Sequence, residues 1–411
     1  MSDSKSQLIS HYEKALRIKY DNSYVHDKLA QIYQSQFKFQ EASYHYIKSI
    51  QFDPNTLKNY WDLKYSLLIL LSLIGNNEKI DSSLLEEGIT IFRQTIQNQP
   101  NFYFANVVLG ILLTLQGKSE EAIDCYQAAS YQQIFLSRPQ LIEKYWDFDQ
   151  KLPPSFIIPG FIRCGTTSLY SYLSTHPQVL PAIDKELLFF SNFFEQSIDY
   201  YLAHFPSISN STNYITGEAT PIYINDSRIA KKIFALFPKI KFIILLRNPI
   251  DRAISSYYHQ HQASCEYKLT QSSITETIGK IPTVINKWFN LLFYEPSLLL
   301  EAYQTEYINY LLLPDLLGSL YIYYLKEWMT IFPREQFLIL KSGDLFENSS
   351  ATMKQVYSFL NLPDYQVPKY SNHNPGSYPP IPDNLRRQLV EFFHPYNQQL
   401  EEYLGMKFNW E

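Results

Sequence analysis

The C-terminal part of the chain alternates short apolar runs with longer amphipathic stretches. The apolar runs cover residues 156–158, 214–217, 242–246 and 337–340, and turn residues bound them. Runs of this length between helical stretches are typical of strands in a βαβ arrangement. The pattern therefore predicts an α/β domain with a mostly parallel sheet and helices on both faces, a three-layer α/β/α architecture.

The N-terminal third shows helical periodicity and repeats itself. Tyr12 recurs as Tyr46, 34 positions later, within a wider match of neighbouring residues. This period resembles that of the tetratricopeptide repeat (TPR), which stacks antiparallel helix pairs. Residues 100–129 form the best copy, residues 21–50 a weaker one, and residues 57–79 predict a lengthened helix pair.

Three parts of the chain follow from these patterns. We expect a TPR-like, all-α helical repeat domain at residues 1–130, a linker at 131–153 and the α/β domain at 154–411. Repeats of this kind offer a concave surface to a protein partner, or they brace the domain that follows. The sequence leaves both roles open.

Composition and charge exclude two classes of protein. With 45% hydrophobic and 18% charged residues, the chain can bury a large core, which excludes global disorder. A net charge of -5 argues against a nucleic-acid binder that works through bulk electrostatics. Any anion site must therefore be local.

The sequence also predicts a compartment. Three cysteines are too few for a disulfide framework. The polar N-terminus lacks the apolar core of a secretory signal, and the longest apolar run, residues 65–74, is too short to span a bilayer. We expect a cytoplasmic protein without a membrane span.

A glycine-containing loop follows the first predicted strand. Gly160 and Gly165 have the separation of the Walker A loop, but Thr166 occupies the lysine position and Arg163 supplies a cation instead. A strand, a loop and a helix in this order place backbone N–H groups around a phosphate. The alternative is an ordinary strand-to-helix turn.

The third predicted strand ends in a second candidate phosphate ligand. Arg247 stands where a P-loop NTPase has the aspartate that helps to hold magnesium, and Ser255 follows on a helix that Pro249 opens. A guanidinium binds phosphate directly and bidentately, so we expect no metal. Taken alone, Arg247 has the alternative of a structural ion pair.

Together these segments resemble the 5′-phosphosulfate loop and the 3′-phosphate motif of sulfotransferases that use 3′-phosphoadenosine-5′-phosphosulfate (PAPS). The resemblance is closest to the heparan sulfate and bacterial carbohydrate-type branch. It runs over residues 154–411 and includes KELLFF at 185–190 and GEATP at 217–221. It implies a P-loop-like sulfotransferase domain, PAPS as cofactor and 3′,5′-bisphosphoadenosine as product.

The resemblance also assigns residue roles. It implies that Glu186 is the general base and that Arg163 stabilises charge on the departing phosphate, as in-line transfer to a hydroxyl requires. The implied cofactor-binding residues are Arg163, Cys164, Gly165, Thr166, Thr167, Ser168, Arg247 and Ser255, with Asn374, Gly376, Ser377 and Tyr378 in a C-terminal loop.

Other readings of these residues remain. On spacing alone, Glu186 is a solvated charge beside Lys185, and His259 and His261 are rival bases. Glu218 and His259 are candidate acceptor contacts, but Glu218 is equally suited to cap a turn.

Departures from the family bear on the acceptor. The family usually has lysine at the position of Arg163, and the heparan enzymes have a lysine where Ala219 stands. The C-terminal loop, basic in those enzymes, is not basic here. These losses argue against a long polyanion and leave a small molecule, a glycolipid or a carbohydrate, sulfated on a hydroxyl or an amine. The aromatic segment 263–318 is either an acceptor lid or extra helical packing.

Three function classes therefore compete. The first is a PAPS-dependent sulfotransferase. The second is a TPR scaffold with a degenerate domain that binds PAPS or its product without turnover. A P-loop nucleotide kinase is disfavoured, because it needs the lysine and the carboxylate that Thr166 and Arg247 replace.

Overall fold

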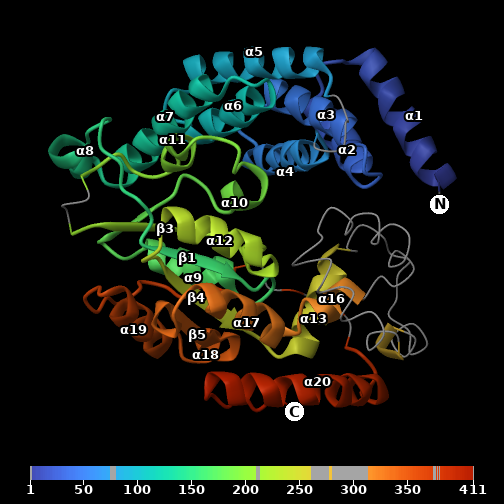
Figure 1. Ribbon diagram of the computed structural model, residues 1–411. Coiled ribbons are helices and arrows are strands. Elements are labelled where there is room, and N and C mark those ends of the chain that lie inside the picture. The colour runs from blue at the N-terminus through green and yellow to red at the C-terminus, as the bar shows by residue number, and fades with distance from the viewer. Residues whose placement is uncertain are drawn as a thin grey trace. The chain divides into compact units, whose positions relative to one another are not determined.

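The computed structural model divides into two compact units. It describes residues 2–74, 80–209, 213–260, 277–279 and 313–410, except 374, 375, 377 and 379. The helical unit comprises Met1–Pro153, Ala182–Asp184 and Asn192–Asn213, and the α/β unit comprises Pro154–Pro181, Lys185–Ser191 and Tyr214–Glu411. Figure 1 shows the elements of both.

The helical unit confirms that the N-terminal region is all-helical. Its assignment to the TPR class stays a prediction. Its described helices are α1 (Ser2–Ile18), α2 (Ser23–Gln34), α3 (Phe39–Phe52), α4 (Leu57–Ile74), α5 (Ser82–Asn98), α6 (Tyr103–Leu115), α7 (Ser119–Ser137), α8 (Pro139–Tyr145) and α11 (Ile198–Leu202).

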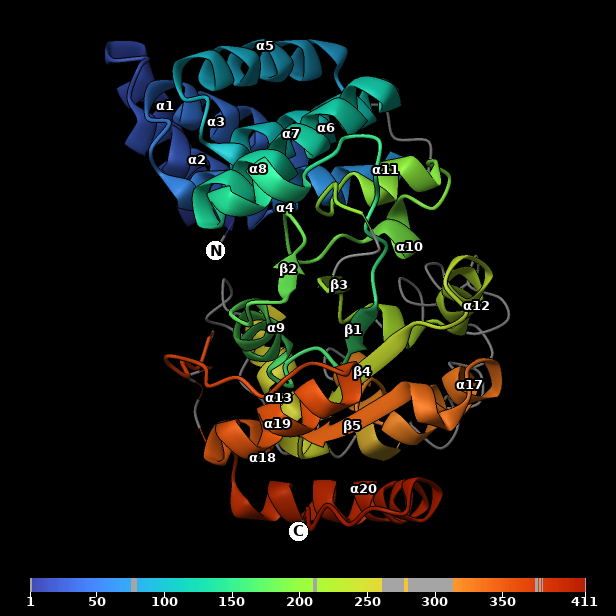
Figure 2. The ribbon, with the colours of Figure 1, turned by 90° about the vertical axis from the view of Figure 1, so that its left-hand side faces the viewer.

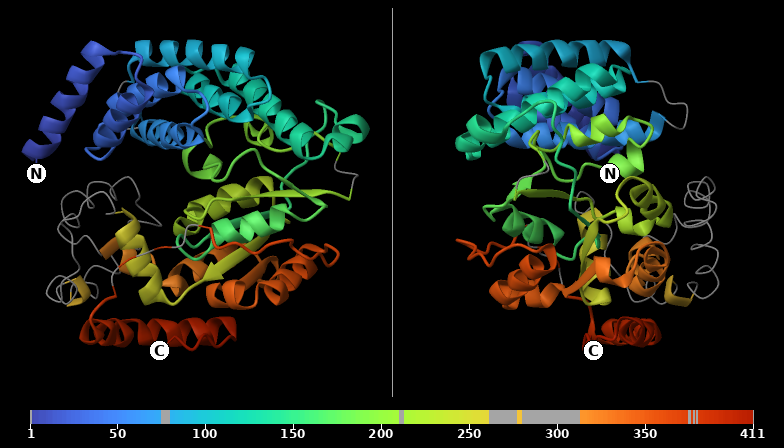
Figure 3. Two further views of the ribbon diagram at one scale, coloured as in Figure 1. Left: turned by 180° about the vertical axis from the view of Figure 1, so that it is seen from behind. Right: turned by 60° about the vertical axis from the view of Figure 1, so that its left-hand side comes forward.

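Most helices that follow one another in the chain pack together, α6 with α7 among them. Figure 3 shows the ribbon from two further sides. Gly110 of α6 permits the approach of α6 to α7, because a Cβ there would lie 2.4 Å from the ring of Tyr126. Gly117 then turns the chain at φ +80°, a conformation that glycine adopts without steric cost. The best copy of the repeat thus forms the predicted helix pair.

Two predictions for this region differ from the structure. Residues 57–74 form one helix of 18 residues rather than a helix pair, because Leu63, Leu67 and Leu70 make one continuous buried stripe. The expected linker at 131–153 is largely helical, since α7 continues to Ser137 and α8 follows. Its apolar side chains pack although the repeat spacing is lost.

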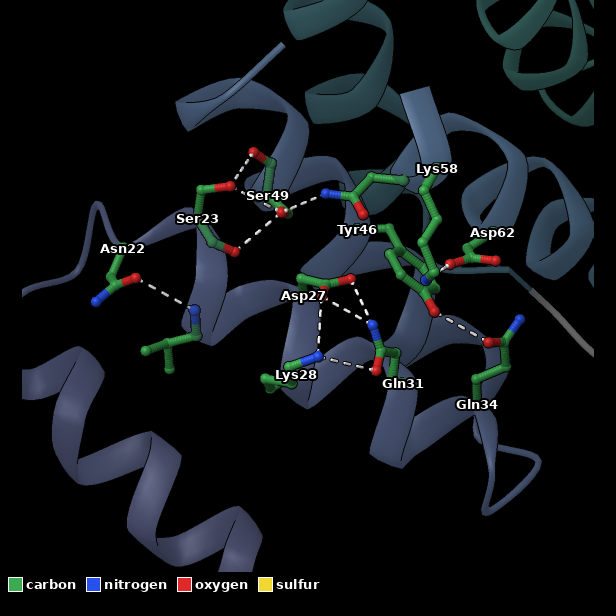
Figure 4. A network of polar contacts seen from close by, with 12 residues as sticks. Asn22, Ser23, Asp27, Lys28, Gln31, Gln34, Tyr46, Ser49, Lys58 and Asp62 are labelled. Carbon is green, nitrogen blue, oxygen red and sulfur yellow. Dashed lines mark hydrogen bonds and ion pairs between the residues drawn. The ribbon is translucent and has the colours of Figure 1, made fainter. Parts of the chain in front are cut away.

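Polar contacts join α2, α3 and α4 (Figure 4). The hydroxyls of Ser23 and Ser49 lie 3.0 Å apart, and the Asn59 amide donates to Ser49 at 2.8 Å. Tyr46 donates to Gln34 at 2.9 Å. Because most of these side chains are buried, the bonds satisfy groups that would otherwise destabilise the core.

Two short segments from further along the chain complete the helical unit. Tyr200 of α11 lies 3.1 Å from the hydroxyls of both Thr114 and Tyr126. Lys64 of α4 makes an ion pair with Asp184, and both side chains are almost fully buried. The core of this unit therefore depends on residues that follow the first strand of the α/β unit.

The α/β unit contains a parallel sheet, which confirms the predicted fold class. Its described strands pair in the order β2, β3, β1, β4, β5, and each neighbouring pair is parallel. Four strands match the predicted runs, whereas β2 was not predicted because three residues carry too little pattern. The strands are β1 (Phe156–Gly160), β2 (Val179–Pro181), β3 (Ile215–Ala219), β4 (Lys241–Leu246) and β5 (Phe337–Lys341).

Helices cover both faces of this sheet. Figure 2 shows α12 and α17 on one side and α9 and α19 on the other. Among the described helices, none is both long and apolar enough to cross a membrane. The unit contains α9 (Thr166–Ser174), α10 (Phe189–Asn192, ending in the helical unit), η1 (Tyr223–Asn225), α12 (Ser227–Leu236), α13 (Pro249–Gln260), α16 (Leu313–Leu317), α17 (Tyr321–Ile331), η4 (Arg334–Gln336), α18 (Ser342–Glu347), α19 (Ser349–Leu360) and α20 (Asp383–Leu404).

Candidate active site

A cavity of about 710 Å³ lies at the carboxyl ends of β1, β4 and β5. Ligands of open α/β sheets bind at this edge, and the volume is in the range of small-molecule sites. Three segments that follow these strands supply most of the lining, and the C-terminal region supplies the rest. The described lining residues are Arg163, Gly165, Thr166, Thr167, Arg247, Asn248, Asp251, Lys341, Ser342, Gly343, Asp344, Phe346, Glu347, Asn372, His373, Gly376, Phe408, Asn409 and Trp410.

The loop after β1 turns its carbonyl groups toward the protein. Arg252 donates to the carbonyl of Ile162 at 3.2 Å, and Ser342 donates to the carbonyl of Cys164 at 2.6 Å. Arg163 and Gly165 adopt positive φ angles of 64° and 93°, while the amide of Cys164 between them donates to the carbonyl of Phe161 at 3.2 Å. Since the first amides of α9 have no partner within the helix, the loop is built to bind an anion.

Two guanidinium groups lie close together beside this loop. Arg247 donates to the carbonyl of Arg163 at 3.2 Å and to the hydroxyl of Tyr378 at 2.9 Å. Burial and the charge of Arg247 lower the pKa of Arg163, although a guanidinium remains charged at neutral pH. A bound anion would relieve this repulsion.

Other predicted cofactor-binding residues support the loop. Ser255 is buried and accepts from Arg163 at 3.1 Å, so it reaches the site through that residue. Cys164 is buried with its sulfur 3.8 Å from the hydroxyl of Tyr321, and burial raises its pKa. Ser168 accepts from the amide of His373 at 3.0 Å. Thr166 and Thr167 line the cavity itself.

The C-terminal loop contributes in part. Gly376 lines the cavity, and the ring of Tyr378 stacks on Tyr258 at 5.7 Å. Asn374 and Ser377, which were also predicted to bind the cofactor, lie outside the described residues. The same holds for His261 and for most of the predicted acceptor lid at 263–318.

Glu186 lies in the α/β unit near His259, and it is not among the described residues that line the cavity. Its side chain is 42% exposed and sits 3.2 Å from Lys185. Burial and the charge of Arg163 lower the pKa of His259, and the charge of Glu186 opposes that shift. His259 therefore lies within electrostatic reach of both Arg163 and Glu186.

Glu218, a predicted acceptor contact, is fully buried in β3. It accepts a hydrogen bond of 2.6 Å from Thr220. The structure thus places this carboxylate inside the unit and away from the described cavity lining.

Sequence reasoning missed several lining residues. Lys341 ends β5, and Phe346 lies on α18 with 39% of its surface exposed. The rings of Phe408 and Trp410 stack at 4.3 Å near the end of the chain. An aromatic residue shortly after a predicted strand could have indicated Phe346. No pattern in the sequence indicated that Phe408 and Trp410 line the cavity.

The chain belongs to the sulfotransferase domain family, whose model matches residues 153–374. This match confirms the resemblance predicted from the phosphate loop and the Arg247 motif. It covers more than half of the chain and spans all five described strands.

Several named proteins are similar to the chain. The membrane-associated sulfotransferase kil1 of Dictyostelium discoideum is 25% identical over 63% of this chain and 66% of that protein. The human bifunctional heparan sulfate N-deacetylase/N-sulfotransferase 2 is 29% identical over 51% of this chain and 22% of that protein. The human heparan sulfate glucosamine 3-O-sulfotransferase 5 is 26% identical over 64% of this chain and 75% of that protein. The chain thus spans just under two thirds of the first and about a fifth of the second.

A solved structure, a sulfotransferase from Alicyclobacillus acidocaldarius, has a TM-score of 0.47 and 23% identity. The match covers 63% of this chain and 98% of the chain of that sulfotransferase.

Proposed function

We propose that the protein transfers a sulfuryl group from PAPS to a hydroxyl or amine of a carbohydrate acceptor. The observation that carries the proposal is the pairing of an amide-presenting loop with two arginines in one cavity. Neither a Walker lysine nor a carboxylate at the end of β4 is present, because Thr166 and Arg247 occupy those positions. Family membership supports PAPS as the donor.

The residues of the cavity suit the parts of this donor. The loop amides and Thr166 and Thr167 would hold the 5′ group, and Arg247 the 3′-phosphate. Phe346 and the stacked Phe408 and Trp410 offer aromatic surface for a purine. When bound, PAPS supplies the sulfuryl group that is transferred.

Two residues would carry the chemistry. Glu186 accepts the proton of the acceptor hydroxyl, since its carboxylate is partly exposed and its charge acts on His259, which the charge of Arg163 also reaches. Arg163 stabilises negative charge at the phosphate oxygen through its guanidinium, which Ser255 helps to orient.

A carbohydrate acceptor is supported by the similarity to enzymes named for heparan sulfate. The described cavity lining carries three carboxylates, those of Asp251, Asp344 and Glu347, beside its three cations. That cavity is assigned to the donor, so the preference for a weakly charged sugar over a long polyanion rests instead on the loss of basic residues at Ala219 and in the C-terminal loop. Labelled PAPS with a neutral chito-oligosaccharide and with desulfated heparan sulfate as probes tests both the class and its charge.

Calorimetric titration with 3′,5′-bisphosphoadenosine and with ADP tests the donor site. We expect the bisphosphate to bind much more tightly than ADP, and Arg247→Ala to weaken its binding by about tenfold to a hundredfold, the scale of a hydrogen bond to a charged group. Arg228→Ala is the control, because Arg228 is an exposed arginine paired with Asp226. Equal affinity for ADP, or unchanged binding by Arg247→Ala, would contradict the proposed donor.

A further inference from the structure

The backbone around Glu186 adopts a strained turn. Leu188, two residues later, has φ +57° without being glycine. A left-handed conformation costs a residue with a side chain about 1–2 kcal/mol, so the surrounding structure must hold it. The contacts of residues 187–190 show what does so.

Thr220 holds the residue next to Glu186. The amide of Leu187 donates to the Thr220 hydroxyl oxygen at 3.1 Å, and that hydroxyl donates to the Glu218 carboxylate at 2.6 Å. Thr220 and Glu218 are both fully buried. A hydroxyl that accepts one bond and donates another to a carboxylate is fixed in one rotamer, which fixes the amide in turn.

Tyr223 provides a second anchor on the far side of the turn. Its hydroxyl accepts from the amide of Phe190 at 3.3 Å, and the two rings pack edge to face at 5.6 Å. Burial, followed by the charge of Glu218, raises the pKa of Tyr223 well above its usual value, so this phenol stays neutral. Lys232 of α12 donates to the carbonyl of Phe190 at 3.1 Å.

We propose that Thr220 and Glu218 are positioning residues for Glu186. They hold the Leu187 amide through the chain of bonds from Glu218 to Thr220, and so keep the Glu186 carboxylate where it meets the acceptor. This inference rests on the proposed role of Glu186 as the base. For Glu218, this positioning role replaces the direct contact with the acceptor that was predicted from the sequence.

The test uses the full chain and a matched pair of threonines. Thr220→Val removes the hydroxyl with little change in shape, and Thr220→Ser keeps it. Thr216→Val is the control, because Thr216 is also fully buried and also lies near Glu218 in the chain, but its hydroxyl bonds the carbonyl of Leu180 on β2. Hydrogen exchange at the Leu187 amide reports the anchor, and turnover of labelled PAPS with the two carbohydrate probes reports the consequence.

We expect Thr220→Val to speed exchange at Leu187 and to lower kcat by about tenfold or more, the scale of a misplaced catalytic group, with the affinity for 3′,5′-bisphosphoadenosine unchanged. Thr220→Ser should restore most of the turnover, and Thr216→Val should leave exchange at Leu187 slow. In a Glu186→Gln background, Thr220→Val should cost little more, because it acts through a carboxylate that is already gone.

Several results would overturn the inference. Fast exchange of the Leu187 amide in the unaltered protein would do so even if Thr220→Val did not fold. An equal loss of kcat from Thr220→Val with and without Glu186 would remove the positioning role and leave the base assignment intact. Full activity of Glu186→Gln would instead defeat the base assignment, and this inference with it.

Discussion

Among single residues, Arg163 and Arg247 supply the positive charge that lies beside the loop after β1. The cavity also contains Asp251, but this carboxylate pairs with Arg386 of α20 at 2.9 Å. Arg386, which is not among the described lining residues, thereby neutralises part of the negative charge of the cavity. The two guanidinium groups beside the loop keep their attraction for a phosphate, and because they are partly buried this attraction is less screened by salt than that of surface charges.

Replacing the proposed base should separate binding from chemistry. Glu186→Gln keeps the size of the side chain but cannot accept a proton. We expect turnover to fall by about two to four orders of magnitude, the scale of general-base catalysis, while the affinity for 3′,5′-bisphosphoadenosine stays nearly unchanged. Turnover with labelled PAPS and calorimetry measure the two effects.

His259→Gln is the matched control for this prediction. His259 lies near the same cation, and the combined effect of burial and Arg163 keeps it mostly neutral at neutral pH. If His259 were the base, its replacement would cause the larger loss, and activity in the unaltered protein would rise with pH through a value below 6.5, the usual pKa of the free side chain.

The cavity-lining residues that sequence reasoning found are close to one another in the chain or follow a clear strand. Arg163 to Thr167 form one loop, and Arg247 follows one strand, so their order alone implied a shared edge of the sheet. Lys341 follows the predicted run 337–340, so the rule that found Arg247 could also have found it. Trp410 lies far away in the chain, and no periodicity brings it to that edge. The burial of Glu218 likewise depends on the register of β3 against β1, which the sequence does not specify.

Among the elements, the turn into α9 sets the geometry of the loop that we propose to bind the 5′ group. Gly165 caps this helix at φ +93°, and a Cβ there would lie 3.0 Å from the ring of Phe346. Gly165→Ala should therefore destabilise the protein by about 1 kcal/mol or more and weaken binding of 3′,5′-bisphosphoadenosine. Thermal unfolding and calorimetry measure both effects.

Gly343→Ala is the control for Gly165→Ala. Gly343 lines the same cavity, but its nearest neighbour to a new Cβ is the end of the Glu347 side chain at 3.9 Å. Alanine is favoured over glycine inside a helix such as α18. If both variants lost binding equally, crowding of the cavity rather than the conformation of the loop would be the cause.

Elements were predictable where their pattern was long enough. The runs at β1, β3, β4 and β5 are apolar over several residues, and the helix pair α6 and α7 carries a clear turn glycine. The continuous helix α4 and the helices within the expected linker were missed, because a buried stripe without a breaker residue looks the same in a long helix as in a pair.

The helical unit contains residues from both sides of the first strand, and this arrangement matters for the whole molecule. Tyr200, Tyr201, Phe205 and Ile208 are buried in that unit, each with at most 1% of its surface exposed. Fully burying a large apolar side chain contributes about 1.5–3 kcal/mol. Together these four contributions approach the net stability of about 5–15 kcal/mol that a typical domain has.

A chain cut to residues 154–411 should therefore lose its stability or aggregate. Removing α1 to α8 leaves those four side chains without their partners and exposes them to water. Size-exclusion chromatography and thermal unfolding of the shortened chain, beside the full chain, measure the outcome. A monomeric fragment that unfolds at the same temperature as the full chain would show that the segment 192–213 packs elsewhere.

The same arrangement sets an order of events on the ribosome. Helices α6 and α7 are made early, yet the partner hydroxyl of Tyr126 lies on Tyr200, 74 residues later in the chain. At about 5–20 residues per second, those 74 residues take about 4–15 s to synthesise. The core of the N-terminal helices thus cannot close until β1, the loop after it and Glu186 have been synthesised. The nascent chain therefore carries an open helical array while the proposed catalytic residues are being made.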